Sequence, residues 1–154
     1  MNENEKQALS EALKYLTAKD RSSRGVALHL QEKAYQKETI QSVLAYLQAK
    51  KMIDDFRYAD NYFHKRLKSG YSIHQISEEL KQEGLPDEVI EDARSRFMEE
   101  LSDGIRAKEE AEKLLSQFGY SAKTMRKIAG FLERKGYEAE LVEEILFFIN
   151  EKYE

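Results

Sequence analysis

The sequence MIDDFRYADNYFHKRL, at residues 52–67, decides the fold of this chain. It predicts one helix, because its apolar residues share a single face at about 100° per residue, as in a helix that packs on a core. The residues of that face are Ile53, Phe56, Ala59, Phe63 and Leu67. Asp54 is suited to cap the amino end, and Asp55 is favoured beside the positive end of the helix dipole. We therefore expect Phe56, Ala59, Phe63 and Leu67 to form the core of the middle part of the chain.

The other two faces of the same helix are polar. One carries Tyr58, Tyr62, Lys65 and Arg66, and the other carries Arg57, Asn61, His64 and Lys68. Aromatic hydroxyls mixed with cations suit a binding surface. The same spacing fits tyrosines that pack on a neighbouring helix and cations that are only solvated, so both interpretations stay open.

The composition is typical of a soluble all-α protein. Hydrophobic residues make up 41% of the 154 residues and charged residues 35%, with one Pro and seven Gly, which favours long solvated helices. The absence of cysteine excludes disulfides, thiolate zinc sites and cysteine nucleophiles, and it favours a reducing cytoplasm. Residues 1–5 lack the basic then apolar order of a signal peptide, and the longest aliphatic or aromatic run, residues 145–149, is too short to span a membrane.

The helix signals recur with a period near 50 residues. Ser22, Val26, Leu30, Ala34, Tyr35 and Ile40 align with Ser72, Ile76, Leu80, Gly84, Leu85 and Ile90, and then with Thr124, Ile128, Leu132, Gly136, Tyr137 and Val142. A helix start at Ser121 requires the eighth helix to be extended at its amino end, and Ser72 to Gln75 matches a capping box. We predict about nine helices in three tandem three-helix repeats, residues 1–53, 54–102 and 103–154, stacked into an elongated, curved molecule.

No catalytic or metal-binding motif stands out. His29, His64 and His74 are too scattered for a metal site, and neither a nucleotide-phosphate loop nor a Gly-x-Ser-x-Gly motif occurs. Acid pairs such as Glu78-Glu79 are explained by solvation or capping. We expect a protein that is not an enzyme and needs no cofactor.

Positive charge gathers in three places, although the formal net charge is −4. The first 53 residues carry nine Lys and Arg against six Asp and Glu, whereas the rest of the chain is acidic. Nucleic-acid binding would therefore depend on local basic faces. The candidate partner-binding residues are Arg21, Arg24, Arg57, Tyr62, Lys65, Arg66, Lys68, Lys123, Arg126 and Lys127.

Residues 53–66 resemble the RecX family, whose members show a similar Leu-Asp-Asp-x-Arg-Phe-Ala-x-x-Tyr-x-x-x-Arg segment. Asp20-Arg21-Ser22 and the segment from Gly70-Tyr71-Ser72 to Gly84-Leu85 flank it on the sides that the family pattern requires. The resemblance covers the whole chain. It implies three tandem three-helix repeats in a regulator of the RecA recombinase, acting in DNA repair, recombination and the SOS response.

What the resemblance implies is a binding function. Family members bind the RecA nucleoprotein filament and suppress its ATP hydrolysis, strand exchange and co-protease activity. Asp54, Asp55, Arg57, Tyr62 and Arg66 match the family pattern, either as RecA contacts or as builders of the repeat. We further expect a cytoplasmic monomer with weak direct DNA contact, either a short member or a fragment, since longer relatives carry an extra amino-terminal part. The alternative is a helical-repeat single-strand nucleic-acid-binding protein.

The chain departs from the family pattern at two positions in the first repeat. Gly25 stands where a charged residue is more usual, and Ala34 stands where glycine would more easily adopt a left-handed cap. The net negative charge weakens the inference of direct DNA binding but leaves that of RecA binding unchanged.

Overall fold

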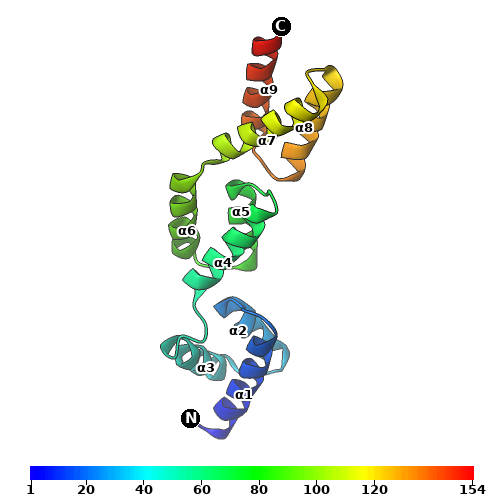
Figure 1. The fold of residues 1–154 in the computed structure, drawn as a ribbon. Helices are drawn as coiled ribbons and strands as arrows, with labels where there is room; N and C mark the ends of the chain where they lie inside the picture. Colours follow the sequence, from blue (N-terminus) through cyan, green and yellow to red (C-terminus); the bar gives the residue numbers. More distant parts are fainter. The chain divides into compact units, whose positions relative to one another are not determined.

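The computed structural model describes residues 1–154 as nine α-helices without a strand (Figure 1). The predicted all-α fold is therefore confirmed. The helices are α1 Glu3–Ala18, α2 Ser23–Glu32, α3 Lys37–Ala49, α4 Asp55–Lys68, α5 Ile73–Glu83, α6 Asp87–Glu100, α7 Asp103–Phe118, α8 Ala122–Arg134 and α9 Ala139–Tyr153. None of them is both long and apolar enough to cross a membrane.

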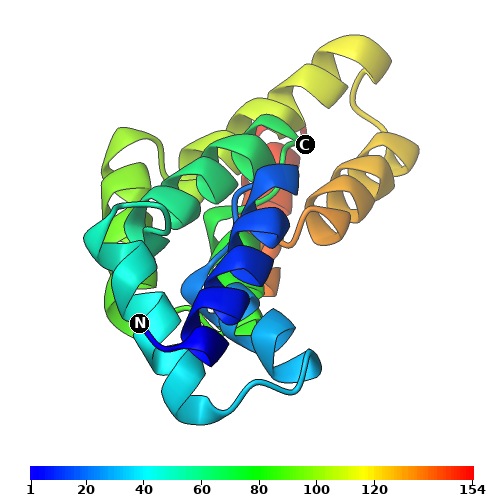
Figure 2. The ribbon, with the colours of Figure 1, turned by 90° about the horizontal axis from the view of Figure 1, so that it is seen from below.

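The chain divides into two compact units, residues 1–61 with 80–90 and residues 62–79 with 91–154. In the first unit α1, α2 and α3 each pack against the other two, with α1 in dark blue in Figure 2. Their shared core consists of Ala8, Ala12, Val26, Leu30, Ile40, Val43, Leu47 and Ile53. Because Ala8 and Ala12 are small and fully buried, the backbone of α1 can lie close to its neighbours.

In the second unit α7, α8 and α9 form the corresponding group. Its core consists of Ala107, Ala111, Ile128, Leu132, Tyr137, Val142, Ile145 and Ile149. Ala107 and Ala111 repeat the fully buried alanine pair of α1. The ring of Phe63 on α4 stacks on Phe97 of α6 with centroids 5.1 Å apart.

The repeat frame extends to the buried polar residues and to the backbone. Three polar side chains are buried, at the equivalent positions Ser22, Ser72 and Thr124. Ser22 and Ser72 cap α2 and α5, whereas α8 begins earlier, as predicted, with Ser121 as its N-cap and the Thr124 hydroxyl bonded to it. A residue one or two positions after the second helix of each repeat has positive φ: 67° at Ala34, 88° at Gly84 and 80° at Gly136. The positions that align between the three repeats in the sequence therefore have the same local structure in each repeat.

The capping box predicted at Ser72 is half formed. The Ser72 hydroxyl accepts the N–H of Gln75 at 2.9 Å, but the N–H of Ser72 donates to the carbonyl of Lys135 at 2.9 Å. The Gln75 amide is consequently free of the cap and donates to Glu79 at 3.1 Å. A contact with the last repeat has replaced the local one, which the local pattern could not indicate.

The prediction that Phe56 belongs to the core is wrong, because its side chain is 44% exposed. Ala59 and Phe63 on the same face are fully buried, and Ile53 is 2% exposed. Phe56 points to the same side as Phe63 but lies about 10 Å earlier along the helix axis, in the first turn of α4. A helical wheel gives the direction of a side chain and not its height, so it could not detect this.

Candidate partner-binding surface

Asp54 and Asp55 begin α4 in different ways. The carboxylate of Asp54 accepts the N–H groups of Phe56 and Arg57 at 3.0 and 3.3 Å, so the predicted N-cap is confirmed. The carboxylate of Asp55 instead accepts the N–H of Ser23, the first residue of α2, at 2.8 Å. Asp55 therefore stabilises the amino end of a helix in the preceding repeat.

Asp103, the first residue of α7, caps a helix of the middle repeat in the same way as Asp55 caps α2. Its two carboxylate oxygens accept the N–H groups of Ile73 and His74, at 2.8 and 3.1 Å, at the start of α5. A carboxylate at these positions is favoured by the unpaired N–H groups and the positive end of the helix dipole. The acid that opens each following repeat thus caps the second helix of the one before.

Arg66 on α4 and Glu79 on α5 form a bidentate ion pair. Arg66 Nε and Nη2 donate to the two carboxylate oxygens of Glu79 at 2.9 and 2.6 Å. The Tyr62 hydroxyl and the Gln75 amide donate to the same carboxylate at 2.8 and 3.1 Å. Two of the predicted contact residues, Tyr62 and Arg66, therefore hold α4 to α5 within the middle repeat.

The pKa values of this pair follow from its partners. Burial raises the pKa of Glu79, but the hydrogen bonds from Arg66, Gln75 and Tyr62 and the charge of Arg66 outweigh burial, so the pKa lies below its usual range. The hydrogen bond to Glu79 likewise raises the pKa of Arg66 against the effect of burial. Both groups are held in their charged forms.

The turn after α4 is held by further cations. The Arg66 guanidinium lies 3.7 Å from the ring centroid of Tyr71, and the Lys135 ammonium lies 4.4 Å from the same centroid. Lys135 Nζ also donates to the carbonyl of Ser69 at 3.0 Å. Arg106 donates to the carbonyls of Tyr71 and Leu67 at 2.9 and 3.0 Å. These contacts join the middle repeat to α7 and α8, and sequence spacing contained no signal for them.

Two of the predicted residues in the first unit are also engaged within the chain. Arg21 lies 4.1 Å from the ring centroid of Tyr15, and its Nε is buried. Arg57 donates to the carbonyls of residues 51 and 52, in the turn that follows α3, and lies 3.7 Å from Asp20. Arg24 is exposed, and its Cδ, Nε and Cζ atoms fill the space beside Gly84.

The remaining predicted cations are exposed to solvent. They are Lys65 and Lys68 on α4 and Lys123, Arg126 and Lys127 on α8. Lys127 lies 4.7 Å from the ring centroid of Phe118, which is 48% exposed. These five side chains and Arg24 retain charges that can meet a partner.

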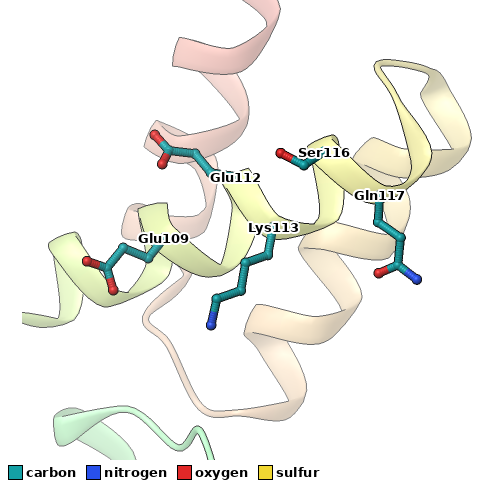
Figure 3. A pocket seen from close by; sticks show the side chains of 5 residues that line it. All are labelled: Glu109, Glu112, Lys113, Ser116 and Gln117. Atoms are coloured by element: carbon teal, nitrogen blue, oxygen red, sulfur yellow. The ribbon is translucent and has the colours of Figure 1, made fainter.

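One surface hollow lies on α7 alone. A shallow hollow on α7 is lined by Glu109, Glu112, Lys113, Ser116 and Gln117, which all project from a single helix (Figure 3). Side chains from one exposed helix face cannot enclose a small molecule, since ligand sites are concave and lined from several elements. No group of three or more His, Asp and Glu side chains is placed to hold a metal ion.

The fold and its repeated caps define a protein of the helical-repeat class. Family models described as the first and the second three-helix domain of RecX match residues 8–47 and 54–93, which together make up more than half of the chain. The chain belongs to the RecX family, as the sequence resemblance predicted. The second match contains α4 and the Arg66 to Glu79 ion pair.

Relatives and solved structures agree with this assignment. The chain is similar to Regulatory protein RecX of Mannheimia succiniciproducens, 33% identical over 56% of this chain and 57% of that protein. It is 26% identical to Regulatory protein RecX of Trichlorobacter lovleyi over 87% of this chain and 90% of that one. The crystal structure of RecX from Lactobacillus salivarius has the same fold, with a TM-score of 0.78 and 22% identity over 97% and 99% of the two chains. The chain thus spans little more than half of the first relative and most of the second.

Proposed function

We propose that this chain is a negative regulator of RecA that binds the RecA-DNA filament and inhibits its ATPase, strand-exchange and co-protease activities. The observation that supports this most is the match to both RecX three-helix domains, the second of which contains the Asp-Asp-x-Arg segment at residues 54–57. Regulation would be achieved by binding alone, in the cytoplasm and as part of DNA repair and the SOS response.

The exposed cations are the proposed contacts with the filament. Arg24, Lys65 and Lys68 project into solvent, as do Lys123, Arg126 and Lys127 on α8. Charges of this kind steer association and choose an acidic or phosphate-bearing surface rather than supply most of the affinity. Arg57, Tyr62 and Arg66 are proposed to act indirectly, because their polar groups already form hydrogen bonds within the chain. Arg21 is proposed to act indirectly as well, because its guanidinium lies over the ring of Tyr15 and its Nε is buried.

The ATPase of RecA on single-stranded DNA tests the proposal. The purified chain is expected to slow ATP hydrolysis at stoichiometric or lower ratios to RecA. Charge reversal of Lys65 and Lys68 together is expected to weaken the inhibition, and the matched control reverses Lys14 and Lys33, two cations outside the proposed surface. Unchanged hydrolysis on filaments that are shown to be intact would refute the proposal.

A second candidate function is binding of single-stranded nucleic acid without a role specific to RecA. The observation that favours it is the exposed Phe118 ring beside Lys127 on a helix with two further exposed cations, since such sites combine stacking with phosphate contacts. Titration of a bare oligonucleotide at several salt concentrations separates the two functions. Tight binding that weakens steeply with salt would favour the second, and negligible binding at moderate salt would eliminate it.

A further inference from the structure

A groove runs between α7 and α9 in the second unit. Its floor is formed by Ala111 and Leu115 of α7 and by Ile145 and Ile149 of α9. Charged residues line its walls, and Phe148 projects beside them. Figure 3 shows Glu112 and Ser116 on the side of α7 that faces α9, which agrees with their place in the lining.

Phe148 is the most exposed large apolar residue of the chain, at 68%, and the neighbouring Phe147 is 60% exposed. The core of the last repeat does not use either ring, since Val142, Ile145 and Ile149 supply the buried side of α9. The repeat frame places Tyr46 and Arg96 at the positions equivalent to Phe148, so the earlier repeats carry a residue with a polar group there. An exposed pair of large rings beside an apolar groove marks an interaction surface.

The charges on the groove walls have a symmetric order. Along α9, Glu144, Phe148 and Lys152 lie one turn apart on one stripe, with the acid before the ring and the base after it. Along α7, Lys108 comes first and Glu112 follows one turn later. The amino ends of the two helices lie at the same end of the groove, because residues 104, 141 and 144 also line one further hollow together. The end of the groove at the helix amino ends therefore carries Glu144 of α9 and Lys108 of α7. The other end carries Lys152 of α9 and Glu112 of α7, so acid and base have changed helices.

We propose that this face pairs with the same face of a second copy of the chain, with the two α9 helices antiparallel about a two-fold axis beside Phe148. In this arrangement Glu144 meets Lys152 of the second copy, Lys108 meets Glu112 of the second copy, and the two Phe148 rings enter the apolar grooves. A two-fold interface requires self-complementary charge, and the stripe of Glu144, Phe148 and Lys152 on α9 has it.

The neighbouring stripe of α9 does not have this property. Glu143 and Glu151 lie one turn before and after Phe147, so a two-fold pairing centred on Phe147 would bring acids together. The charge pattern therefore selects Phe148 as the centre. A monomer is the expectation from the sequence alone, whereas the groove depends on α7 and α9, which pack together only in the folded chain. The pairing does not rest on the proposed regulation of RecA.

The mass in solution tests the proposal. Light scattering coupled to gel filtration, over a wide range of concentrations, is expected to show a rise from 18.0 kDa to twice that mass. Glu144→Lys and Lys152→Glu are each expected to weaken self-association at least about tenfold, because each change creates two like-charge contacts in a two-fold interface. The double variant restores both pairs in reversed order and is expected to dimerise like the original chain.

Glu143→Lys is the matched control, since it reverses an exposed acid on the same helix outside the groove, and it should leave dimerisation unchanged. Phe148→Ser is expected to abolish dimerisation while circular dichroism stays unaltered, because the ring is exposed. A mass of 18.0 kDa at every concentration would overturn the proposal. A dimer that survives Phe148→Ser, or a folded double variant that stays monomeric, would also overturn it.

Discussion

Replacing Arg66 by Met tests whether this cation builds the middle repeat or contacts a partner. Met keeps most of the side-chain volume but removes two charge-assisted hydrogen bonds to Glu79 and the contact with Tyr71. Bonds to charged groups contribute about 1.5–3 kcal/mol each. The side chains of Arg66 and Glu79 are 28% and 19% exposed, so solvent screening reduces the total. We expect the free energy of unfolding to fall by about 2 kcal/mol, after allowing for that screening and for the lack of additivity among contacts in one network.

For a chain of this length, 1 kcal/mol corresponds to about 2–4 °C in Tm. Arg66→Met should therefore lower the Tm, followed by far-UV circular dichroism at neutral pH, by about 4–8 °C. Lys65→Met is the matched control, because it removes an exposed positive charge from the adjacent position of the same helix, and it should change stability by less than about 0.5 kcal/mol. If both variants melt within about 1 °C of the original chain, the ion pair contributes nothing and Arg66 is available to a partner.

Four further predictions concern stability. Folding lowers the pKa of Glu79, so the ionised carboxylate contributes fully to the free energy of unfolding above the unfolded pKa of about 4.3, and this contribution is lost as the pH falls below that value. The Tm of Glu79→Gln should therefore decrease less in this acid range than the Tm of the original chain. Ala34→Gly should raise the free energy of unfolding by about 1 kcal/mol in urea denaturation, because Ala34 has a φ of 67°, and no change would show that the cap is unstrained. Burial raises the pKa of Tyr137 to about 12, and its hydroxyl is buried without a hydrogen-bond partner. Tyr137→Phe should therefore leave the Tm unchanged or raise it, and a fall of several degrees would show that the hydroxyl does form a stabilising hydrogen bond. Asp103→Asn should cost about 1 kcal/mol and expose the amino end of α5 to hydrogen exchange, and protection equal to that of the original chain would contradict the capping role.

Local patterns were sufficient to predict the helices and the repeat frame. Ser22 and Ser72 are caps, and the left-handed conformation of Ala34 was anticipated from its alignment with Gly84 and Gly136. These features depend on a few adjacent residues, so periodicity and capping chemistry can identify them. The division into repeats at residues 53/54 and 102/103 stays a prediction, although the breaks fall between α3 and α4 and between α6 and α7.

The candidate surface was harder to predict because it depends on contacts between helices. Arg66 and Glu79 are 13 residues apart on different helices, and the distance between their side chains depends on how α4 and α5 cross. The same is true of Asp55, which lies 32 residues from its partner at the start of α2. A single sequence shows which side chains share a helix face but not which carboxylate a given arginine will reach. The exposed cations, which are Arg24, Lys65, Lys68, Lys123, Arg126 and Lys127, stay predicted partner contacts.

The caps supplied by Asp55 and Asp103 have a consequence for synthesis on the ribosome. The second helix of the first repeat is complete only when residue 55 has been made, and α5 only when residue 103 has been made. The segment needed to complete the first or the second repeat is therefore longer than that repeat, because it includes at least the first residue of the next repeat. Vectorial folding of such a chain would proceed by overlapping steps, in which each new repeat finishes its predecessor. A truncation placed at residue 54 or 102 would remove the closing carboxylate, whereas one placed a turn later would retain it.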